Sequence, residues 1–588
     1  MSWHSITLFM WGYQPHFRFQ FEHLMDSAMK VLGVHDAGAK CLLVGTKIPG
    51  ADVQHDVCVE PEDGQWPIAL FADLPVAIEE IVKTHPLQNT FYGDEPSMRD
   101  KPENMRRDSV RQAVEAALVS YDANEGVRSF AGAPAPVGGY YVVPVLQLPN
   151  SIFERFRPLR EPVTNGRFTA APSMTHASVK QVLKEAHDEL LRPDPGRHLG
   201  AKSASAAEVV RRAASDFMYT PGIAIGDRSY GGPDLFERFN LISSLMYEGT
   251  EGKGPMLLAS LGSGAVEVAL ALDEPVPFHE PRWSRKVLQM ASSETALLAN
   301  CASILGLGNI TPGTDPWTAQ NVFEVQFHDH YHWSLSCGDE VLLVSKYGAP
   351  SLPQDKLPRT RLIDTFKRLF PEVTSDDVDS FTKLCDTAVE QRHGSMLVVA
   401  RDASNESARL SGQGTKIVPT KLTPRLYHRV SNIDGTIIID PHCFCHAVGV
   451  ILDGPAREDC TPSRGARYNS GIRYVGATTT PRLAVVVSDD KTVDVIPVLL
   501  PRICRSTAEE QVARLEASNK DNYHPVIAWL DRHRFYLDSA QCDRVNAANN
   551  RIDNELREAG EIRTLRPAFH PDPLSTADYF MPEGRGSA

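Results

Sequence analysis

The segment IDGTIIID (433–440) decides how the C-terminal half of the chain is interpreted. Three consecutive isoleucines between turn residues and Asp440 are typical of a short, strongly apolar strand. The chain enters this strand through an acidic residue, Asp434, and through Gly435, whose missing side chain lets a ligand approach the backbone. The segment therefore predicts a buried strand whose N-terminal end a ligand can reach.

Helical and strand patterns alternate on both sides of this segment. Two helical stretches (360–370 and 375–391) lead to a strand at 395–402, and further strands are expected at 445–453 and 483–490. We therefore predict an α/β (α+β) multidomain protein whose C-terminal half is a mixed sheet flanked by helices, followed by a helical tail. The predicted domains are an N-terminal α/β domain (1–165), a second α/β domain (166–355), a third domain (361–505) and a helical C-terminal extension (506–588).

The N-terminal half contains less regular patterns. The polar stretch 92–111 is interpreted as an exposed loop, and 255–272 as a pair of neighbouring strands. Residues 283–304 show helical spacing, and 321–348 reads as a hairpin.

Composition narrows the function classes. A chain of 588 residues corresponds to about four domains, at roughly 150 residues each. The formal charge of −14 argues against a protein that mainly coats a nucleic-acid backbone, since such binding relies on clustered lysines and arginines. No apolar run approaches the length of a membrane-spanning helix, and the ten cysteines lack the spacing of a disulfide framework. We expect a cytoplasmic protein with reduced thiols that binds no DNA and no membrane.

A histidine-rich segment, FEVQFHDHYHW (323–333), alternates apolar and polar residues. Read as one strand, it places Glu324, His328, His330 and His332 on one face, where they could chelate zinc or another transition metal. A half-buried strand with a histidine-rich solvent face is the better explanation, because nothing in the sequence fixes a fourth ligand. The similar cluster HCFCH (442–446) is better explained by core cysteines, because alternation separates its thiols from its imidazoles.

Several small-residue loops accompany Asp434 in the third predicted domain. They are RLSGQGTK (409–416), the glycine- and arginine-rich turn SRGARYNSGIRY (463–474), which enters a helical stretch, and the acidic strand end VVVSDD (485–490). Together they offer a carboxylate for a divalent metal, with guanidinium and backbone donors for a triphosphate. On spacing alone, ordinary loops of an α/β domain remain an equally good explanation.

Taken in order, these motifs resemble the diadenylate cyclase domain. The resemblance covers about 120 residues and rests on HGSMLVVA (393–400), LSG (410–412), DGT (434–436), AVGVIL (447–452), RGARYN (464–469) and VVVSDD (485–490). It implies that two such domains meet face to face, each presenting one ATP. Two attacks of a ribose 3′-hydroxyl on an α-phosphate would then yield a cyclic dinucleotide.

The resemblance assigns a role to each matching position. It implies catalytic roles for Asp434, Gly435 and Thr436, with Asp434 as the ligand of Mg²⁺ or Mn²⁺. It implies nucleotide binding by Ser411, Gly412, Gly465, Arg467, Tyr468, Asn469, Ser488 and Asp489. The chain departs from the family pattern at Ala466, Tyr468 and Asn469, where the family has Thr, His and Arg. These departures put the adenine preference, the cyclic product and activity itself in question.

Residues 165–355 resemble, more loosely, the sensor domains fused ahead of such cyclases. The expected function is therefore a sensor-regulated, metal-dependent nucleotidyltransferase that makes cyclic di-AMP or a related cyclic or linear dinucleotide, mainly from ATP. It would act as a homodimer or higher homo-oligomer, and antiviral signalling is a hypothesis from this architecture. The alternatives are a catalytically inactive nucleotide-binding sensor that uses the same pocket, and a scaffold module.

Overall fold

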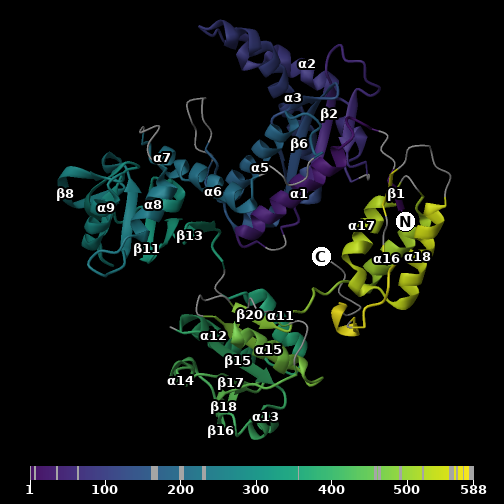
Figure 1. Ribbon diagram of the computed structural model, residues 1–588. Helices are drawn as coiled ribbons and strands as arrows, with labels where there is room; N and C mark the ends of the chain where they lie inside the picture. The colour runs from purple at the N-terminus through teal and green to yellow at the C-terminus, as the bar shows by residue number, and fades with distance from the viewer. Residues whose placement is uncertain are drawn as a thin grey trace. The chain divides into compact units, whose positions relative to one another are not determined.

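The computed structural model forms two compact units (Figure 1). The first unit comprises Met1–Pro353, Ser518–Ala528 and Asn549–Pro567, and the second comprises Gln354–Ala517, Trp529–Ala548 and Ala568–Ala588. The structure describes residues 2–4, 8–34, 37–62, 65–160, 170–197, 204–227, 234–354, 357–391, 393–455, 460, 465–488, 493–519, 522–554, 562–564, 567–573 and 575–581. The predicted boundary at residue 165 lies outside these ranges, and the four predicted domain ranges stay predictions.

An antiparallel sheet in the order β3-β2-β6-β4, with β5 also pairing with β6, organises the first part of unit 1. Its strands are β2 (Lys40–Lys47), β3 (Val57–Glu60), β4 (Val127–Ala131), β5 (Ala135–Val137) and β6 (Tyr140–Pro149). Alternate side chains of β2 enter two separate cores, since Leu43 packs in one and Leu42 in the other. Helices α1 (Gln14–Val31), α5 (Met174–Leu190) and α6 (Ala206–Phe217) contribute to the first core, and α2 (Leu74–Thr84) and α3 (Glu95–Glu125) to the second.

The prediction of an exposed loop at 92–111 is wrong, because most of this stretch forms the first half of α3. The Asp94 carboxylate caps the helix by accepting a hydrogen bond from the Ser97 amide at 2.9 Å. Only Ser109, Val110, Ala113, Val114 and Leu118 are buried. The polar residues that suggested a loop therefore lie on the solvent side of a helix.

A second sheet in unit 1 has eight strands in the order β14-β13-β12-β11-β7-β9-β10-β8. They are β7 (Gly254–Ala259), β8 (Val266–Pro277), β9 (Ala296–Ala299), β10 (Ser303–Ile310), β11 (Val322–Asp329), β12 (His332–Cys337), β13 (Glu340–Lys346) and β14 (Ala349–Ser351). Helices α8 (Leu235–Ser244) and α9 (Pro281–Val287) belong to the same region. β8 is an edge strand, and it exposes Val268 and Leu270 by 46% each.

Two predictions fail in this sheet. The strands at 255–272 are not neighbours, because β9 and β10 lie between β7 and β8. The helix expected over 283–304 stops at Val287, after which the chain forms a short turn of 3₁₀ helix and the buried strand β9. β9 is buried at every position, so its short apolar run lacks the periodicity that separates a strand from a buried helix.

The histidine-rich segment is also not one strand. β11 ends at Asp329, the chain turns at His330 and Tyr331, and β12 begins at His332. The prediction continued the strand period of two residues through this turn, where that period does not hold, and the single face that it assigned to the three histidines is therefore wrong. The His328 and His332 rings lie 4.6 Å apart on neighbouring strands, and His328 Nε2 lies 2.8 Å from Ser334 Oγ. Within the described ranges, no three His, Cys, Asp or Glu side chains are grouped so that they could hold a metal ion.

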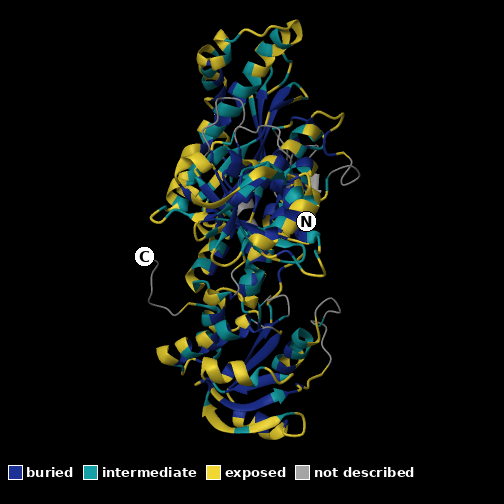
Figure 2. Ribbon diagram, turned by 90° about the vertical axis from the view of Figure 1, so that its left-hand side faces the viewer, coloured by how far each residue is buried: buried dark blue, intermediate teal, exposed yellow. Residues whose placement is uncertain are grey.

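Unit 2 contains the predicted mixed sheet, in the order β16-β18-β17-β15-β19-β20. Its strands are β15 (Ser395–Ala400), β16 (Thr415–Lys421), β17 (Thr436–Ile439), β18 (Phe444–Val450), β19 (Arg482–Val487) and β20 (Val493–Ile496). Helices α11 (Arg359–Leu369), α12 (Ser375–Glu390) and α14 (Pro424–Val430) contribute to the core on one face, and α13 (Ala403–Arg409) and α15 (Ala466–Gly476) to the core on the other. Figure 2 shows the inner strands of this sheet as buried, with helices around them, and the outer strand β16 as exposed. The predicted fold class is confirmed.

The helical tail is also confirmed, with α16 (Arg505–Ala517), α17 (His524–Arg532) and α18 (Ser539–Asp553). Among the helices of the described residues, none is both long enough and apolar enough to cross a membrane.

The C-terminal segment 567–581 lies against the rest of unit 2 through arginine–aromatic contacts. Arg368 on α11 lies 4.8 Å from the Tyr579 ring, and it donates hydrogen bonds to the carbonyls of Leu500 (2.7 Å) and Asp578 (3.4 Å). Its side chain is only 3% exposed. Arg505 stacks on Phe580 and Arg534 on Phe569. Arg368 thus joins the α/β sandwich to the C-terminal segment.

Replacing Arg368 with alanine should release this segment. The change removes the stacking contact and the hydrogen bond to the Leu500 carbonyl, while Arg502 still donates to the Asp578 carbonyl at 3.0 Å. We therefore expect a loss of about 2 kcal/mol of unfolding free energy in urea. Limited proteolysis should then cut within 567–581 earlier than in the wild type. Lys367→Ala, an exposed neighbour on the same helix, is the matched control, and equal effects of both substitutions would contradict the assignment.

Candidate functional site

The register of the unit 2 sheet brings the predicted loops to one edge. β15 pairs in parallel with β17, with Met396 opposite Thr436. On its other side β15 pairs antiparallel with β19, so Ser395 lies opposite Val487. The antiparallel pair β17–β18 sets Thr436 opposite Val450. The starts of β15 and β17 and the ends of β18 and β19 therefore form one edge, which we call the candidate edge.

Four predicted residues reach this edge by way of their strands. Asp434 and Gly435 immediately precede β17, Thr436 begins it, and Ser488 immediately follows β19. Asp489 lies outside the described residues.

The loop with Ser411 and Gly412 reaches the same edge from α13. The Ile451 amide, directly after β18, donates a hydrogen bond to the Gln413 carbonyl at 3.0 Å. Gly414 packs so closely on Val450 that a Cβ there would lie 2.7 Å from its side chain. Ser411 and Gly412 are exposed beside this contact.

Helix α15 brings the arginine motif to Asp434. Gly465 caps the helix in an extended conformation, and Arg467 in the first turn extends toward the mouth of β17. Arg467 Nη2 lies 3.3 Å from Asp434 Oδ1, although 33 positions separate the two residues. The Asp434 side chain is 92% exposed and that of Arg467 is 37% exposed. Because such exposed pairs are weak, this contact does not prevent the Asp434 carboxylate from binding a ligand.

The remaining predicted residues are less exposed to solvent than Asp434. Thr436 is buried and its hydroxyl has no hydrogen-bond partner among the described residues, so it does not share the exposure of Asp434. Tyr468 packs with the core beneath α15. The backbone N–H of Asn469 donates a hydrogen bond to the Gly465 carbonyl at 3.3 Å, within the first turn of the helix.

Gly435 determines how closely the start of β17 approaches β18. Its φ of 123° is rarely adopted by residues with a side chain, and a Cβ would lie 2.5 Å from the carbonyl carbon of Gly449 on β18. Since the obstacle is backbone, no side-chain rotation could relieve the clash.

Gly435→Ala should therefore push β17 and β18 apart at the candidate edge. We expect a loss of more than about 2 kcal/mol of unfolding free energy, from backbone strain and overlap together. Gly412→Ala on the neighbouring loop is the control, because its methyl group would meet nothing within 4 Å beyond the adjoining residues of the chain. Urea unfolding of both variants checks this. A Gly435→Ala protein as stable as Gly412→Ala would refute the close approach.

A partly buried ionic network lies beside the candidate edge, and sequence reasoning missed it. Glu406 on α13 accepts hydrogen bonds from Tyr474 Oη (2.8 Å) and from Arg409, and lies 3.1 Å from Arg482 Nη2 on β19. Arg409 also binds both oxygens of Asp453, at 2.6 and 2.8 Å. The network thus joins α13, α15 and β19. Its long-range contacts give no short-range signal, since they join segments 44 and 68 residues apart. The local pair of Glu406 and Arg409, three positions apart, is typical of any solvated helix.

The pKa of Glu406 reflects this network. Burial by itself would raise the pKa of the carboxyl, but the hydrogen bonds from Arg409 and Tyr474 and the charge of Arg482 outweigh it and hold the pKa below its usual value. Glu406 therefore stabilises the folded state as a carboxylate.

Glu406→Gln should lower the unfolding free energy at neutral pH by about 2 kcal/mol, because the buried Arg482 loses one of its two carboxylates and keeps Asp402, at 3.2 Å. A depressed folded-state pKa means that this contribution is complete above the unfolded-state pKa, near 4.3, and disappears as pH falls through the folded-state value. The difference between wild type and variant should accordingly shrink below about pH 4.3.

Urea unfolding between neutral and acidic pH measures this difference. Glu510→Gln, an exposed glutamate of α16, should change stability little at any pH. A wild-type-to-variant difference that grows on acidification would contradict the assigned role of Glu406.

The prediction of core cysteines at 442–446 agrees with the structure. Cys443 and Cys445 are buried, and burial raises the pKa of Cys443 to about 12 and that of Cys445 to about 11. The imidazoles pair with carboxylates instead: His442 Nδ1 lies 2.9 Å from Asp377, and His446 Nε2 lies 3.1 Å from Asp440. All ten cysteines are free.

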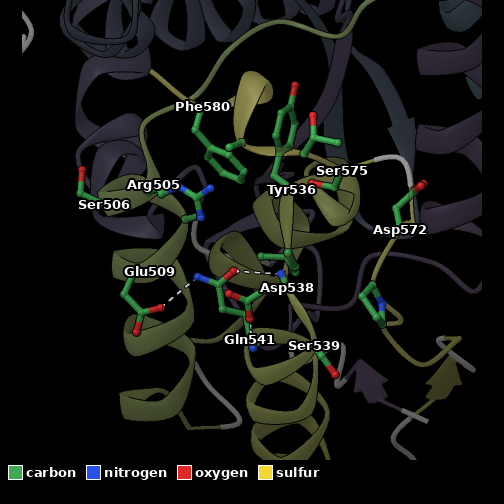
Figure 3. A pocket seen from close by; sticks show the side chains of 15 residues that line it. Arg505, Ser506, Glu509, Tyr536, Asp538, Ser539, Gln541, Asp572, Ser575 and Phe580 are labelled. Atoms are coloured by element: carbon green, nitrogen blue, oxygen red, sulfur yellow. Dashed lines mark hydrogen bonds between the residues drawn. The ribbon is translucent and has the colours of Figure 1, made fainter. Parts of the chain in front are cut away.

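A hollow of about 530 Å³ lies in the helical tail (Figure 3). Arg505, lying over the Phe580 ring, forms part of its wall, and Gln541 links Glu509 to Asp538. Since none of the predicted site residues lines this hollow, it is separate from the candidate edge.

Two regions of unit 1 match known protein families. Residues 10–218 match the model described as "Probable sensor domain DACNG", and residues 233–339 match the model described as "Probable sensor domain DACNH". No curated protein matches the chain.

Among solved structures, the chain is similar to a crystal structure of a DacA double mutant from Staphylococcus aureus, with 15% identity and a TM-score of 0.18. This match covers 21% of the present chain and 83% of the other. A hypothetical membrane spanning protein from Bacillus cereus matches with 19% identity and a TM-score of 0.18, over 22% of this chain and 62% of that one. The chain thus contains two regions similar to probable sensor domains, in addition to the sheet of unit 2.

Proposed function

We propose that the chain is a metal-dependent nucleotidyltransferase that joins two nucleoside triphosphates, with ATP favoured, into a dinucleotide under the control of its sensor regions. One observation carries the proposal: Asp434 and Arg467, distant in sequence, lie 3.3 Å apart at the candidate edge, beside the loop of Ser411 and Gly412. The two sensor-domain matches support it, since such domains precede diadenylate cyclases.

The donor chemistry at the edge fits Mg²⁺ or Mn²⁺. These ions prefer oxygen ligands and are commonly held by one or two carboxylates together with substrate phosphates. Asp434 offers such a carboxylate almost fully exposed, and no cluster of three acidic, histidine or cysteine side chains surrounds it among the described residues. The bound ion would supply charge neutralisation and polarise the ribose 3′-hydroxyl.

The residues of the chain would position the triphosphate. Arg467 offers a planar guanidinium fork to phosphate oxygens, and the α15 N-terminus after Gly465 adds backbone N–H groups that favour an anion. The network beside the edge fixes α15 through Tyr474, so the guanidinium is held by a rigid helix.

In each transfer, the 3′-oxygen of one nucleotide forms a bond to the α-phosphorus of the other, the α–β phosphoanhydride bond breaks, and pyrophosphate leaves. One edge provides half of this arrangement. Two copies facing each other would complete it and would permit a cyclic product such as cyclic di-AMP. Antiviral signalling stays a hypothesis about the use of that product.

A second candidate function is nucleotide binding without catalysis. The observation that favours it is again the contact between Arg467 and Asp434, because an arginine that neutralises the carboxylate competes with a metal ion for it. This alternative expects saturable nucleotide binding without release of pyrophosphate.

The test is a product assay with each nucleoside triphosphate, alone and in mixture, in Mg²⁺ or Mn²⁺, read by mass spectrometry. Asp434→Asn should lower dinucleotide formation by about 100-fold or more, since it removes the charge that holds the ion. Asp379→Asn, on the exposed face of α12, should leave the rate unchanged.

The two functions give different results in this assay. A dinucleotide that disappears in Asp434→Asn supports the synthase and identifies its bases. Nucleotide binding with no pyrophosphate release, equal in wild type and Asp434→Asn, would reject catalysis in favour of the binding protein.

A further inference from the structure

A second hollow, of about 610 Å³, lies in unit 1 where its two sensor-like regions meet. One wall is formed by Phe153 and Glu154, near the end of α4 (Asn150–Arg155), and by residues 157–160, all in the first matched region. The other wall is formed by Trp317, Thr318 and Gln320, in and after α10 (Pro316–Ala319) of the second region. Small-molecule sites occur preferentially at such junctions, and the volume lies in their usual range.

Two arginines line this junction together with one exposed acidic residue, Glu154. Arg160 Nη2 donates to the Thr318 carbonyl at 2.6 Å, and the Arg160 amide donates to Gln320 Oε1 at 3.0 Å. Arg157 lies 4.9 Å from the Trp317 ring and 3.2 Å from Glu340. Each guanidinium is thus oriented by contacts from the opposite wall while remaining on the exposed lining of the hollow.

The remaining lining suits a flat ring. Trp317 supplies most of the aromatic surface, since Phe153 is only 8% exposed, and Gln320 and Thr318 supply hydrogen-bonding groups at its margin. Aromatic side chains bind flat rings by stacking, and guanidinium forks bind phosphate with two parallel hydrogen bonds. The two kinds of group lie side by side here.

We propose that this junction binds a phosphorylated molecule with a flat ring, of which a nucleoside monophosphate is the simplest example, with Arg157 and Arg160 on the phosphate and Trp317 against the ring. Such a ligand would contact both sensor-like regions at once and would strengthen the contacts that already join them. The proposal does not depend on catalysis at the candidate edge, because the two sites share no residue.

The test is an equilibrium binding titration of the full chain with adenosine, cytidine, guanosine and uridine 5′-monophosphates. EDTA is added so that metal-dependent binding at the candidate edge does not contribute. At least one nucleotide should saturate one site per chain. Arg157→Gln with Arg160→Gln should weaken that binding at least about tenfold, because charge-assisted hydrogen bonds are lost.

Two controls distinguish this site from binding elsewhere on the chain. Arg155→Gln removes a neighbouring exposed arginine that also lies over an aromatic ring, that of Phe156, and should leave the affinity within about twofold, since surface changes away from a site have small effects. Arg467→Gln should leave binding unchanged, because it alters only the candidate edge. Thermal unfolding of each variant verifies that it is folded.

Four outcomes would overturn the proposal. They are no saturation by any of the four nucleotides at millimolar concentration, equal weakening by Arg155→Gln, loss of binding in Arg467→Gln, and inorganic phosphate binding as tightly as the nucleotide. The third would assign the binding to the candidate edge, and would leave the proposed function intact. The fourth would show that the flat ring contributes nothing to binding at this junction.

Discussion

The candidate site depends on the position of β15 between a parallel and an antiparallel neighbour. The parallel partner β17 begins at the edge where β15 begins, and the antiparallel partner β19 ends there. This pairing requires both faces of the sheet to be covered. All six residues of β15 are buried, and they alternate between two cores, with Leu397 in one and Val398 in the other. Without both helical layers, the mouth of β17 and the end of β19 would not share an edge.

Much of unit 2 could be predicted from its sequence, because its strands are short apolar runs between clear turns and its helices have amphipathic spacing. The family resemblance supplied what periodicity could not, which was the meeting of Asp434 with Arg467 across 33 residues. Glu406 and its partners were missed for a physical reason. A buried ion pair between distant segments leaves no pattern in either segment, and a glutamate in a short helix looks the same whether it is solvated or enclosed.

The errors in unit 1 arise where local patterns are ambiguous. The first half of α3 is rich in polar residues because most of its surface faces solvent. Such a composition is also typical of an exposed loop. β9 is a short apolar run among helix-forming residues, and only its pairing between β7 and β10 makes it a strand. In the histidine-rich hairpin, the turn at His330 and Tyr331 contains neither glycine nor proline to mark it. In each case long-range packing decided between local alternatives.

The outer strand of the eight-stranded sheet has a consequence for handling the molecule. β8 exposes an unpaired row of backbone groups along Val266–Leu272, with apolar side chains such as Val268 and Leu270 in solvent. Such an edge is a template for another strand, and proteins protect it with charges and prolines. Here Glu267 lies near the start of the strand, and Asp273, Glu274 and two prolines lie in its last part, which leaves residues 268–272 without a charge or a proline. Mutual repulsion between the acidic chains then keeps the rest apart, and salt weakens that repulsion. Association through this edge would thus become easier as ionic strength rises, and the solubility of the protein would fall.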